Sequence, residues 1–214
     1  MDAAKIKLKT MLWAVFTILF IEVSGATLNI PGISTLSAIG LLRLLEIGSL
    51  LAIVLLIEGN LCSVGVHAAT IFSGIRKGVL WSMAFGLVVA LLALVLLALG
   101  KNPLLFVKMR LPDHPRTILL LFVVGGVIAP VAEEFFFRGI IFTFFRRWGF
   151  LFALCLTSII FACLHLASSG IPVVQLVGGV LFAAAFEIEK NLLAPMVIHI
   201  MGNLAIFSIS LILS

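Results

Sequence analysis

Two adjacent carboxylates, Glu133 and Glu134, lie in the otherwise apolar segment 117–145, and Arg138 is the one cation of that segment. A charged side chain near the centre of a bilayer costs about 2.5–3.5 kcal/mol on insertion scales, so such residues usually face a bundle interior and often mark function. On an α-helix, Glu134 and Arg138 are four residues apart and share a face, whereas Glu133 is turned away by about 100°. The pattern predicts that Arg138 pairs with Glu134 and leaves Glu133 to face a cavity.

Polar groups in two later apolar segments can complete such a site. His165 lies in one segment, and His199 and Asn203, which share a helical face, lie in another. Counting about 1.5 Å per residue from the predicted span ends places these groups and Glu133 in the same middle slab of the membrane. A glutamate there can act as a general base towards water, and imidazole and amide groups can hold a developing oxyanion. Together these groups supply what a peptidase requires.

Other chemistries fit the residues less well. Cys163 and His165 point to different faces of a helix, and Ser168 and Ser169 fall in a predicted outer loop, which does not favour a nucleophilic serine or cysteine. The acids and histidines could ligate zinc, but no HExxH sequence is present, so we expect no cofactor and keep zinc as the alternative. Buried Glu and His residues can also relay protons in a transporter, although no internal repeat supports that class.

The composition is that of a membrane protein. Of the 214 residues, 63% are hydrophobic and 11% are charged, and the mean hydropathy is +1.34. Several runs reach the roughly 20 apolar residues that cross a bilayer, and none shows the short alternating segments of a membrane barrel. We therefore predict an all-α, polytopic transmembrane helical bundle of about seven spans. The predicted spans are 11–30, 36–57, 79–100, 117–145, 149–167, 173–187 and 191–213.

The predicted spans divide into two regions. Residues 1–116 form an N-terminal accessory region of about three spans plus loops, and residues 117–214 form a catalytic core of about four spans. Residues 58–78 are more polar and predict a loop with a short interfacial helix. Pro130 and Pro195 each remove a backbone hydrogen bond, so we expect both helices to bend and to open a wet cavity near the polar cluster.

The remaining charges indicate topology and internal pairing. The net charge of +5 is scattered over short loops, which does not favour a nucleic-acid surface. Placing the N-terminus inside puts eight Lys or Arg residues in inner loops and four in outer loops, which favours this orientation. The eight are Lys5, Lys7, Lys9, Arg76, Lys77, Arg146, Arg147 and Lys190. Within the spans, Arg43 and Glu46 predict an internal ion pair, and Glu22 is interpreted as a lone structural or interfacial acid.

Three motifs resemble, in their order along the chain, those of the CPBP family, which comprises the CaaX-protease and bacteriocin-processing membrane proteins and is also called the ABI family. The motifs are Glu133-Glu134-x-x-x-Arg138-Gly139, Phe161-x-x-x-His165 and His199-x-x-x-Asn203. The stretch NLLAPMVIHIMGN at 191–203 is similar to the last conserved block of that family. The resemblance covers about 117–213, and the first three spans carry none of its motifs.

The resemblance implies a glutamic-type intramembrane endopeptidase that works without a metal. Glu133 would activate the water, supported by the acid and the arginine that follow it. His165 would assist this base or the substrate carbonyl, and His199 and Asn203 would form the oxyanion hole.

The resemblance also implies the partners and the location of the protein. Family members cut prenylated CaaX tails or take part in bacteriocin self-immunity, peptide maturation and the processing of sorting tails. We expect a membrane-anchored protein or peptide that is cut near a terminus, in a bacterial or archaeal cytoplasmic membrane, with the lipid bilayer and no nucleic acid as the other partner. A non-catalytic immunity or assembly protein of the same family is the alternative, beside the transporter, and the oligomeric state stays open.

Overall fold

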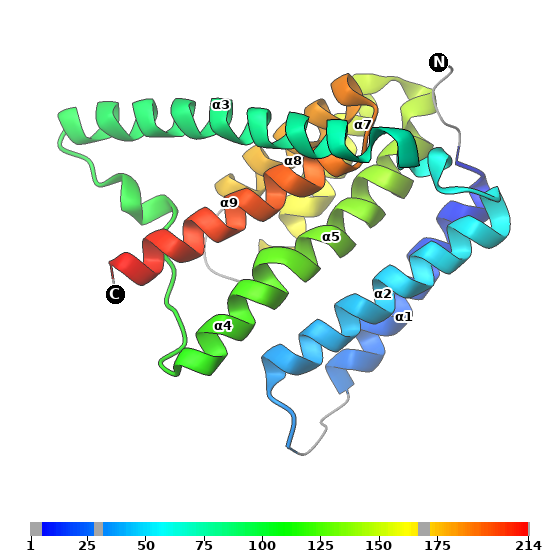
Figure 1. The fold of residues 1–214 in the computed structure, drawn as a ribbon, viewed down its shortest axis with the longest axis horizontal. Helices are drawn as coiled ribbons and strands as arrows, with labels where there is room; N and C mark the ends of the chain where they lie inside the picture. Colours follow the sequence, from blue (N-terminus) through cyan, green and yellow to red (C-terminus); the bar gives the residue numbers. More distant parts are fainter. Residues whose placement is uncertain (1–5, 28–31, 167–171, 214) are drawn as a thin grey trace.

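The computed structural model describes residues 6–27, 32–166 and 172–213. Within them the chain forms seven long helical segments and no strand, which confirms the predicted all-α bundle (Figure 1). The segments are α1 (Leu8–Thr27), α2 (Thr35–Glu58), α3 (Ile71–Ala98), a continuous helix (Pro115–Trp148), α7 (Phe150–Cys163), α8 (Val173–Glu189) and α9 (Leu193–Ile212). Among the described helices, all except α7 and α8 are long and apolar enough to cross a membrane. The predicted span ends at 30 and 167, with Lys5, Ser168 and Ser169, lie outside the described residues.

The long helix that carries the two adjacent acids changes its hydrogen-bond pattern along its length. Its parts are α4 (Pro115–Val123), the π-helical η4 (Val124–Ile128), α5 (Ala129–Glu134), the π-helical η5 (Phe135–Phe142), α6 (Thr143–Phe145) and the 3₁₀ turn η6 (Arg146–Trp148). In η4 the N–H of Ala129 donates to the carbonyl of Val124, five residues earlier. The next donor in this pattern would be Pro130, which has no N–H, so the carbonyl of Gly125 is left without its helical partner. The distortion that we expected at Pro130 is therefore a change of helix type inside a continuous helix.

Helix α3 begins at Ile71, earlier than the predicted start at residue 79. The prediction of a loop with a short helix over 58–78 therefore extended too far, because residues 71–78 belong to α3, which packs closely on α9 here. A methyl group at Gly78 would lie only 2.6 Å from Cβ of Val197, so the two backbones meet where the glycine removes the side chain. The segment before α3 forms two short 3₁₀ turns, η1 (Leu61–Val64) and η2 (Ala68–Thr70).

An apolar core joins the hairpin of α1 and α2 to the long helix. The two helices of the hairpin lie side by side and both contact η5 (Figure 1). Gly40 of α2 lies against η4, where a methyl group at Gly40 would come within 2.9 Å of Cγ2 of Val124. The fully enclosed members of this core are Ile6, Ala14, Leu50, Val54, Val64, Ile140, Ala153, Ala183 and Leu192. This packing places the N-terminal helices beside the two acids.

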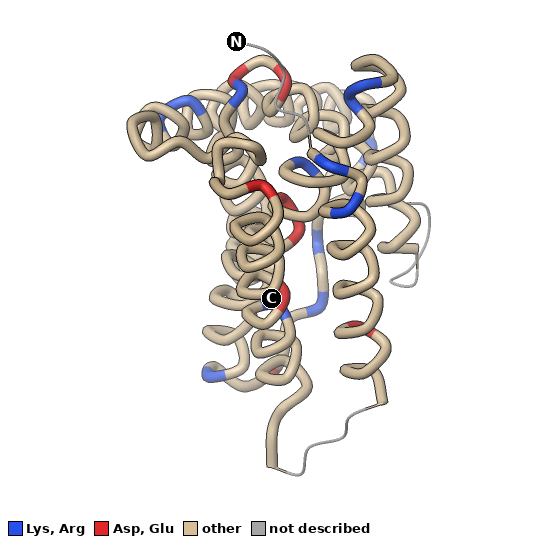
Figure 2. Tube along the Cα trace, turned by 90° about the vertical axis from the view of Figure 1, so that its right-hand side faces the viewer, with Lys and Arg blue, Asp and Glu red and all other residues tan. Residues whose placement is uncertain are grey.

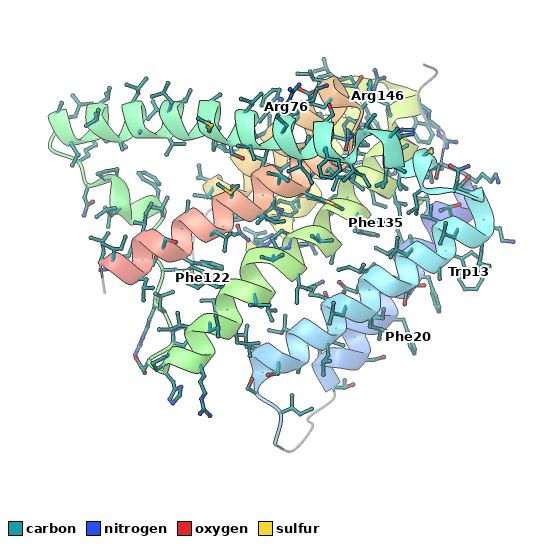
Figure 3. All side chains as sticks on the ribbon, in the orientation of Figure 1. Trp13, Phe20, Arg76, Phe122, Phe135 and Arg146 are labelled. Carbon is teal, nitrogen blue, oxygen red and sulfur yellow. The ribbon has the colours of Figure 1, made fainter. Side chains whose placement is uncertain are left out.

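Large apolar side chains cover the outer surface of the bundle. Trp13 and Phe20 point away from the bundle on α1, and both are at least half exposed (Figure 3). Phe122 instead points from α4 towards α9, where its ring lies 5.6 Å from that of Phe207 (Figure 3). Such a surface suits a lipid environment, in which exposed apolar side chains need no further cover.

A group of ion pairs lies at the end of the bundle near the N-terminus, where many of the lysines and arginines gather (Figure 2). Nζ of Lys77 lies 2.5 Å from Oε2 of Glu189. Arg146 donates two hydrogen bonds of 2.8 and 2.9 Å to Glu187. The cations of the predicted inner loops thus lie at one end, and the direction in which that end faces stays a prediction.

Candidate active site

Glu134 and Arg138 form a completely buried ion pair. NH1 of Arg138 lies 2.9 Å from Oε1 of Glu134, and both side chains are 0% exposed. NH2 of Arg138 donates to the backbone carbonyl of Gly179 on α8 at 3.1 Å. The arginine therefore fixes the long helix to α8 while it neutralises Glu134, as its spacing from that acid predicted.

Three phenylalanine rings surround the guanidinium of Arg138, and those of Phe161 and Phe182 are the nearest. The Cζ atom lies 5.0 Å from the ring centroid of Phe161 and 5.2 Å from that of Phe182. Cation–π attraction is strongest where water is excluded, as it is here. The sequence predicted no role for either ring, because a phenylalanine in an apolar helix is not distinctive. Phe161 was noted only as a member of the second motif.

His199 connects the two glutamates. Its Nδ1 lies 2.8 Å from Oε1 of Glu134, and its Nε2 lies 3.8 Å from Oε2 of Glu133. The imidazole stacks on Phe182 with the ring centroids 4.6 Å apart and the planes at 20°. The side chain of Glu133 is 20% exposed, in contrast to the sealed Glu134. The two adjacent acids thus have different environments: Glu134 is bound by an arginine and an imidazole, whereas Glu133 is partly accessible to solvent.

Asn203 binds the irregular turn of the long helix. Its Nδ2 donates at 2.8 Å to the carbonyl of Gly125, which is the acceptor that Pro130 leaves without a helical partner. The amide has two N–H groups, and this bond uses one of them. Pro130, just before the first motif, therefore explains the position of an amide in the third motif, a relation that the sequence alone did not show.

His165 lies just beyond the end of α7 rather than inside that helix, as the span 149–167 had predicted. The helix ends at Cys163, and the N–H of His165 donates to the carbonyl of Ala162 in a tighter turn. The sequence that follows, Ser-Ser-Gly-Ile-Pro, does not favour a longer helix. Nδ1 of His165 lies 2.8 Å from the carbonyl oxygen of Phe161. The ring of Phe161 lies 4.7 Å from that of His165 and 5.8 Å from that of His199, so it contacts both imidazoles.

Pro195 does not bend α9, and that expectation was wrong. Helix α9 begins at Leu193, so Pro195 lies in the first turn, where a backbone N–H has no acceptor within the helix. The start of α9 is fixed instead by Asn191, whose Oδ1 accepts a hydrogen bond of 2.9 Å from the N–H of Leu193. The amide of Asn191 also donates to the carbonyl of Thr70 at 2.9 Å, which ties α9 to the start of α3.

The described residues contain no group of three or more His, Cys, Asp or Glu side chains placed to hold one metal ion. Nδ1 of His199 is occupied by Glu134, and Nδ1 of His165 by a backbone carbonyl. Structural and catalytic zinc sites use at least three protein ligands around one point. Among the described residues no three such side chains converge on one point, and the absence of a cofactor stays a prediction.

The ion pair predicted within α2 is present and has a third member. NH1 of Arg43 lies 2.6 Å from Oε2 of Glu46, as the spacing predicted, and NH2 lies 2.6 Å from Oε1 of Glu22. Glu22, interpreted as structural or interfacial, thus has a partner that the sequence did not predict. The hairpin brings α1 beside α2, a long-range contact that helical spacing cannot reveal.

Residues 115–205 match the family model described as Type II CAAX prenyl endopeptidase Rce1-like. This segment is therefore similar to the Rce1-like family. The match agrees with the resemblance to CaaX proteases that the three motifs suggested, and all six predicted site residues, from Glu133 to Asn203, lie within it. The Rce1-like segment and the apolar helices together indicate a protease embedded in a membrane. Comparisons with curated proteins and with solved structures find no match to the chain.

Proposed function

We propose that the chain is a CAAX-type intramembrane endopeptidase in which Glu133 activates the attacking water. The observation that carries this proposal is the difference between the two adjacent acids. Glu134 is sealed between Arg138 and His199, whereas Glu133 is partly exposed and faces the other nitrogen of the same imidazole. A general base must reach a water molecule, and Glu133 is the acid in a position to do so.

The proposed reaction begins with transfer of a proton from water to the carboxylate of Glu133. The hydroxide attacks the scissile carbonyl carbon, and the electron pair of the C=O bond moves to oxygen to give a tetrahedral oxyanion. When this intermediate collapses, the C–N bond breaks and Glu133 returns its proton to the leaving amine. The products are a carboxylic acid and an amine, which become a carboxylate and an ammonium group when the second proton of the water passes from the acid to the amine, so the base is regenerated in each cycle.

The oxyanion would be held by His199 and Asn203. Nδ1 of His199 is engaged by Glu134, so Nε2 is the ring nitrogen that would donate towards the substrate. The second N–H of the Asn203 amide supplies another donor, because the first is fixed on Gly125. Preorganised donors of this kind act on the charge that develops in the transition state, where each contributes about 10²–10³-fold to the rate.

The proposed substrate is a membrane-anchored protein or peptide that is cut near a terminus. The carbonyl groups of an intact helix are bonded internally, so the cleaved segment must be unwound when it reaches Glu133. We place the N-terminus inside and the entrance on that side, between the helices that carry the site. The structure also has a groove of about 560 Å³ between α2 and the first part of the long helix, lined by residues such as Leu44 and Ile128. Its lining is largely apolar, so it would suit an apolar segment of the substrate.

The direct test is hydrolysis in water labelled with ¹⁸O. The full-length protein in phospholipid vesicles is incubated with a peptide that ends in a prenylated cysteine and three further residues. An endopeptidase will release the terminal tripeptide and place one ¹⁸O atom in the new carboxylate, as mass spectrometry will show. An intact peptide after prolonged incubation, with protein that is folded by size exclusion and thermal denaturation, would contradict this substrate class.

A further inference from the structure

Helix α8 carries no residue of the three motifs, yet it supplies two groups to the candidate active site. It packs against α7 and α9, whose residues Phe161 and His199 belong to the motifs (Figure 1). The carbonyl of Gly179 accepts the hydrogen bond from Arg138. The second group is the ring of Phe182, which is 7% exposed and lies three residues later on the same face of α8.

The ring of Phe182 contacts both an arginine and an imidazole of the site. The ring centroids of Phe182 and His199 lie 4.6 Å apart, with the planes at 20°. The centroid of the same ring lies 5.2 Å from Cζ of Arg138. Phe161 instead meets His199 and Phe182 edge-on, with the ring planes at 81° and 80°. Phe182 is therefore the ring whose face lies nearly parallel to the imidazole.

A glycine leaves the space that the Phe182 ring occupies on its own helix. Side chains on a helix lean back over the preceding turn. A methyl group at Gly178 would lie 3.3 Å from both Cε2 and Cζ of Phe182, so a larger side chain at that position would crowd the ring. The ring thus lies against its own helix as well as against α9, which limits its freedom to move.

The stack fixes a rotation of the imidazole that its hydrogen bond leaves open. Nδ1 of His199 donates to Oε1 of Glu134 at 2.8 Å, since a carboxylate paired with Arg138 can only accept. A single hydrogen bond allows the imidazole plane to rock about the line that joins the two atoms, whereas a stacked ring holds the plane. In the held orientation, Nε2 of His199 lies 3.8 Å from Oε2 of Glu133.

We propose that Phe182 is a positioning residue that holds the imidazole of His199 in the plane in which Nε2 faces the proposed base and the oxyanion. This inference rests on the proposed function, because the orientation affects the rate only if His199 is an oxyanion donor. Phe182 acts only through the imidazole and takes no part in proton transfer. Displacement of a catalytic group by about 1 Å can lower a rate by about 10²-fold, so a ring without polar atoms can have a large effect.

The first measurement is the rate at which the full-length protein in phospholipid vesicles releases the terminal tripeptide. We expect Phe182→Leu to lower kcat by about 10- to 100-fold and to change KM by less than about twofold, because the stack acts on the transition state and not on substrate binding. Phe182→Tyr keeps the ring and should retain most of kcat.

The matched control is Phe186→Leu, which makes the same change one turn later on α8. Phe186 is 8% exposed, against 7% for Phe182, so the two substitutions remove equally buried rings. The ring of Phe186 packs on Phe142, with the centroids 5.8 Å apart, rather than on a residue of the site. We expect Phe186→Leu to retain kcat.

The second measurement needs no turnover. The chain has four histidines, so protein labelled with ¹⁵N in histidine gives few ring N–H signals, and those of His199 are identified by their loss in His199→Gln. We expect the Nδ1–H proton of His199 to exchange with water about two- to tenfold faster in Phe182→Leu, which corresponds to the contribution of one stacked aromatic pair. The exchange rate should be unchanged in Phe186→Leu.

Several results would overturn the proposal. They are full kcat in Phe182→Leu, an equal loss of kcat in Phe182→Leu and Phe186→Leu, and an unchanged exchange rate at His199. If the unsubstituted protein cleaves no peptide, the proposed function fails, and the exchange measurement alone decides whether Phe182 holds the imidazole. If Phe182→Leu does not fold, Phe182→Met takes its place, because its flexible side chain fills irregular space without a planar face.

Discussion

The buried ion pair of Arg138 and Glu134 permits a quantitative prediction about stability. Arg138→Gln removes a side chain that is 0% exposed and leaves the carboxylate of Glu134 buried without its cation. Breaking a buried pair by removal of one partner destabilises a protein by about 3–5 kcal/mol. The substitution also removes the 3.1 Å hydrogen bond to Gly179 and the contacts with two aromatic rings. We therefore expect a loss at the upper end of this range.

The matched control is Arg146→Gln. Arg146 also pairs with a glutamate, Glu187, but its side chain is 31% exposed. Exposed pairs contribute about 0–1 kcal/mol because water and salt screen them. The free energy of unfolding is measured for both variants by titration with sodium dodecyl sulfate in mixed micelles, followed by circular dichroism. The double variant Glu134→Gln with Arg138→Gln should recover part of the loss, since no charge is then left buried alone.

Equal effects of the two arginine substitutions would refute the reasoning. Such a result would mean that Arg138 is hydrated in the folded protein, or that Glu134 is neutral without it. A double variant less stable than Arg138→Gln alone would also contradict the account, because the uncompensated charge on Glu134 is the assumed source of the loss.

Three further predictions follow from other features. Pro130→Ala should lower the hydrolysis rate by about 10²-fold or more with little loss of stability, because the new N–H competes with Asn203 for the carbonyl of Gly125. A rate equal to that of the unsubstituted protein would show that this hydrogen bond does not position the Asn203 amide. Lys190→Gly should raise the free energy of unfolding by up to about 1 kcal/mol, because Lys190 has φ +50° at the end of α8 and glycine adopts a positive φ without steric cost. A lower free energy of unfolding in the same micelle titration would contradict this. Hydrolysis should persist after exhaustive chelation, because Glu133 and its donors suffice for water attack; loss on chelation with recovery on added zinc would overturn that expectation.

The fold and the relations within single helices could be predicted from the sequence to a large extent. Long apolar runs require helices in a membrane, and pairs such as Glu134 with Arg138 or Arg43 with Glu46 follow from spacing on one helix. Contacts between helices could not be predicted in this way. The place of Glu22 beside Arg43, and of His199 between the two adjacent glutamates, depends on packing that a single sequence does not specify.

Backbone details limited the prediction in a second way. Pro130 indicated a distortion but not its form, since a bend and a π-helical turn both relieve the missing hydrogen bond. Pro195 also suggested a distorted helix, but it lies in the first turn of α9, where a proline removes no hydrogen bond of the helix. Helix α3 starts early because it packs closely on α9 at Gly78. The low helix propensity of glycine would instead predict that no helix forms there.

The central claim is that Glu133 is the base, and the comparison of Glu133→Gln with Glu189→Gln tests it most directly. Both substitutions replace a carboxylate by an amide of the same shape, but Glu189 lies at the end of α8, bound to Lys77 and Trp81, away from the site. In phospholipid vesicles, with the prenylated peptide and matched amounts of folded protein, Glu133→Gln should abolish release of the terminal tripeptide. Glu189→Gln should retain most of it. Substantial release by the purified Glu133→Gln protein would contradict the account.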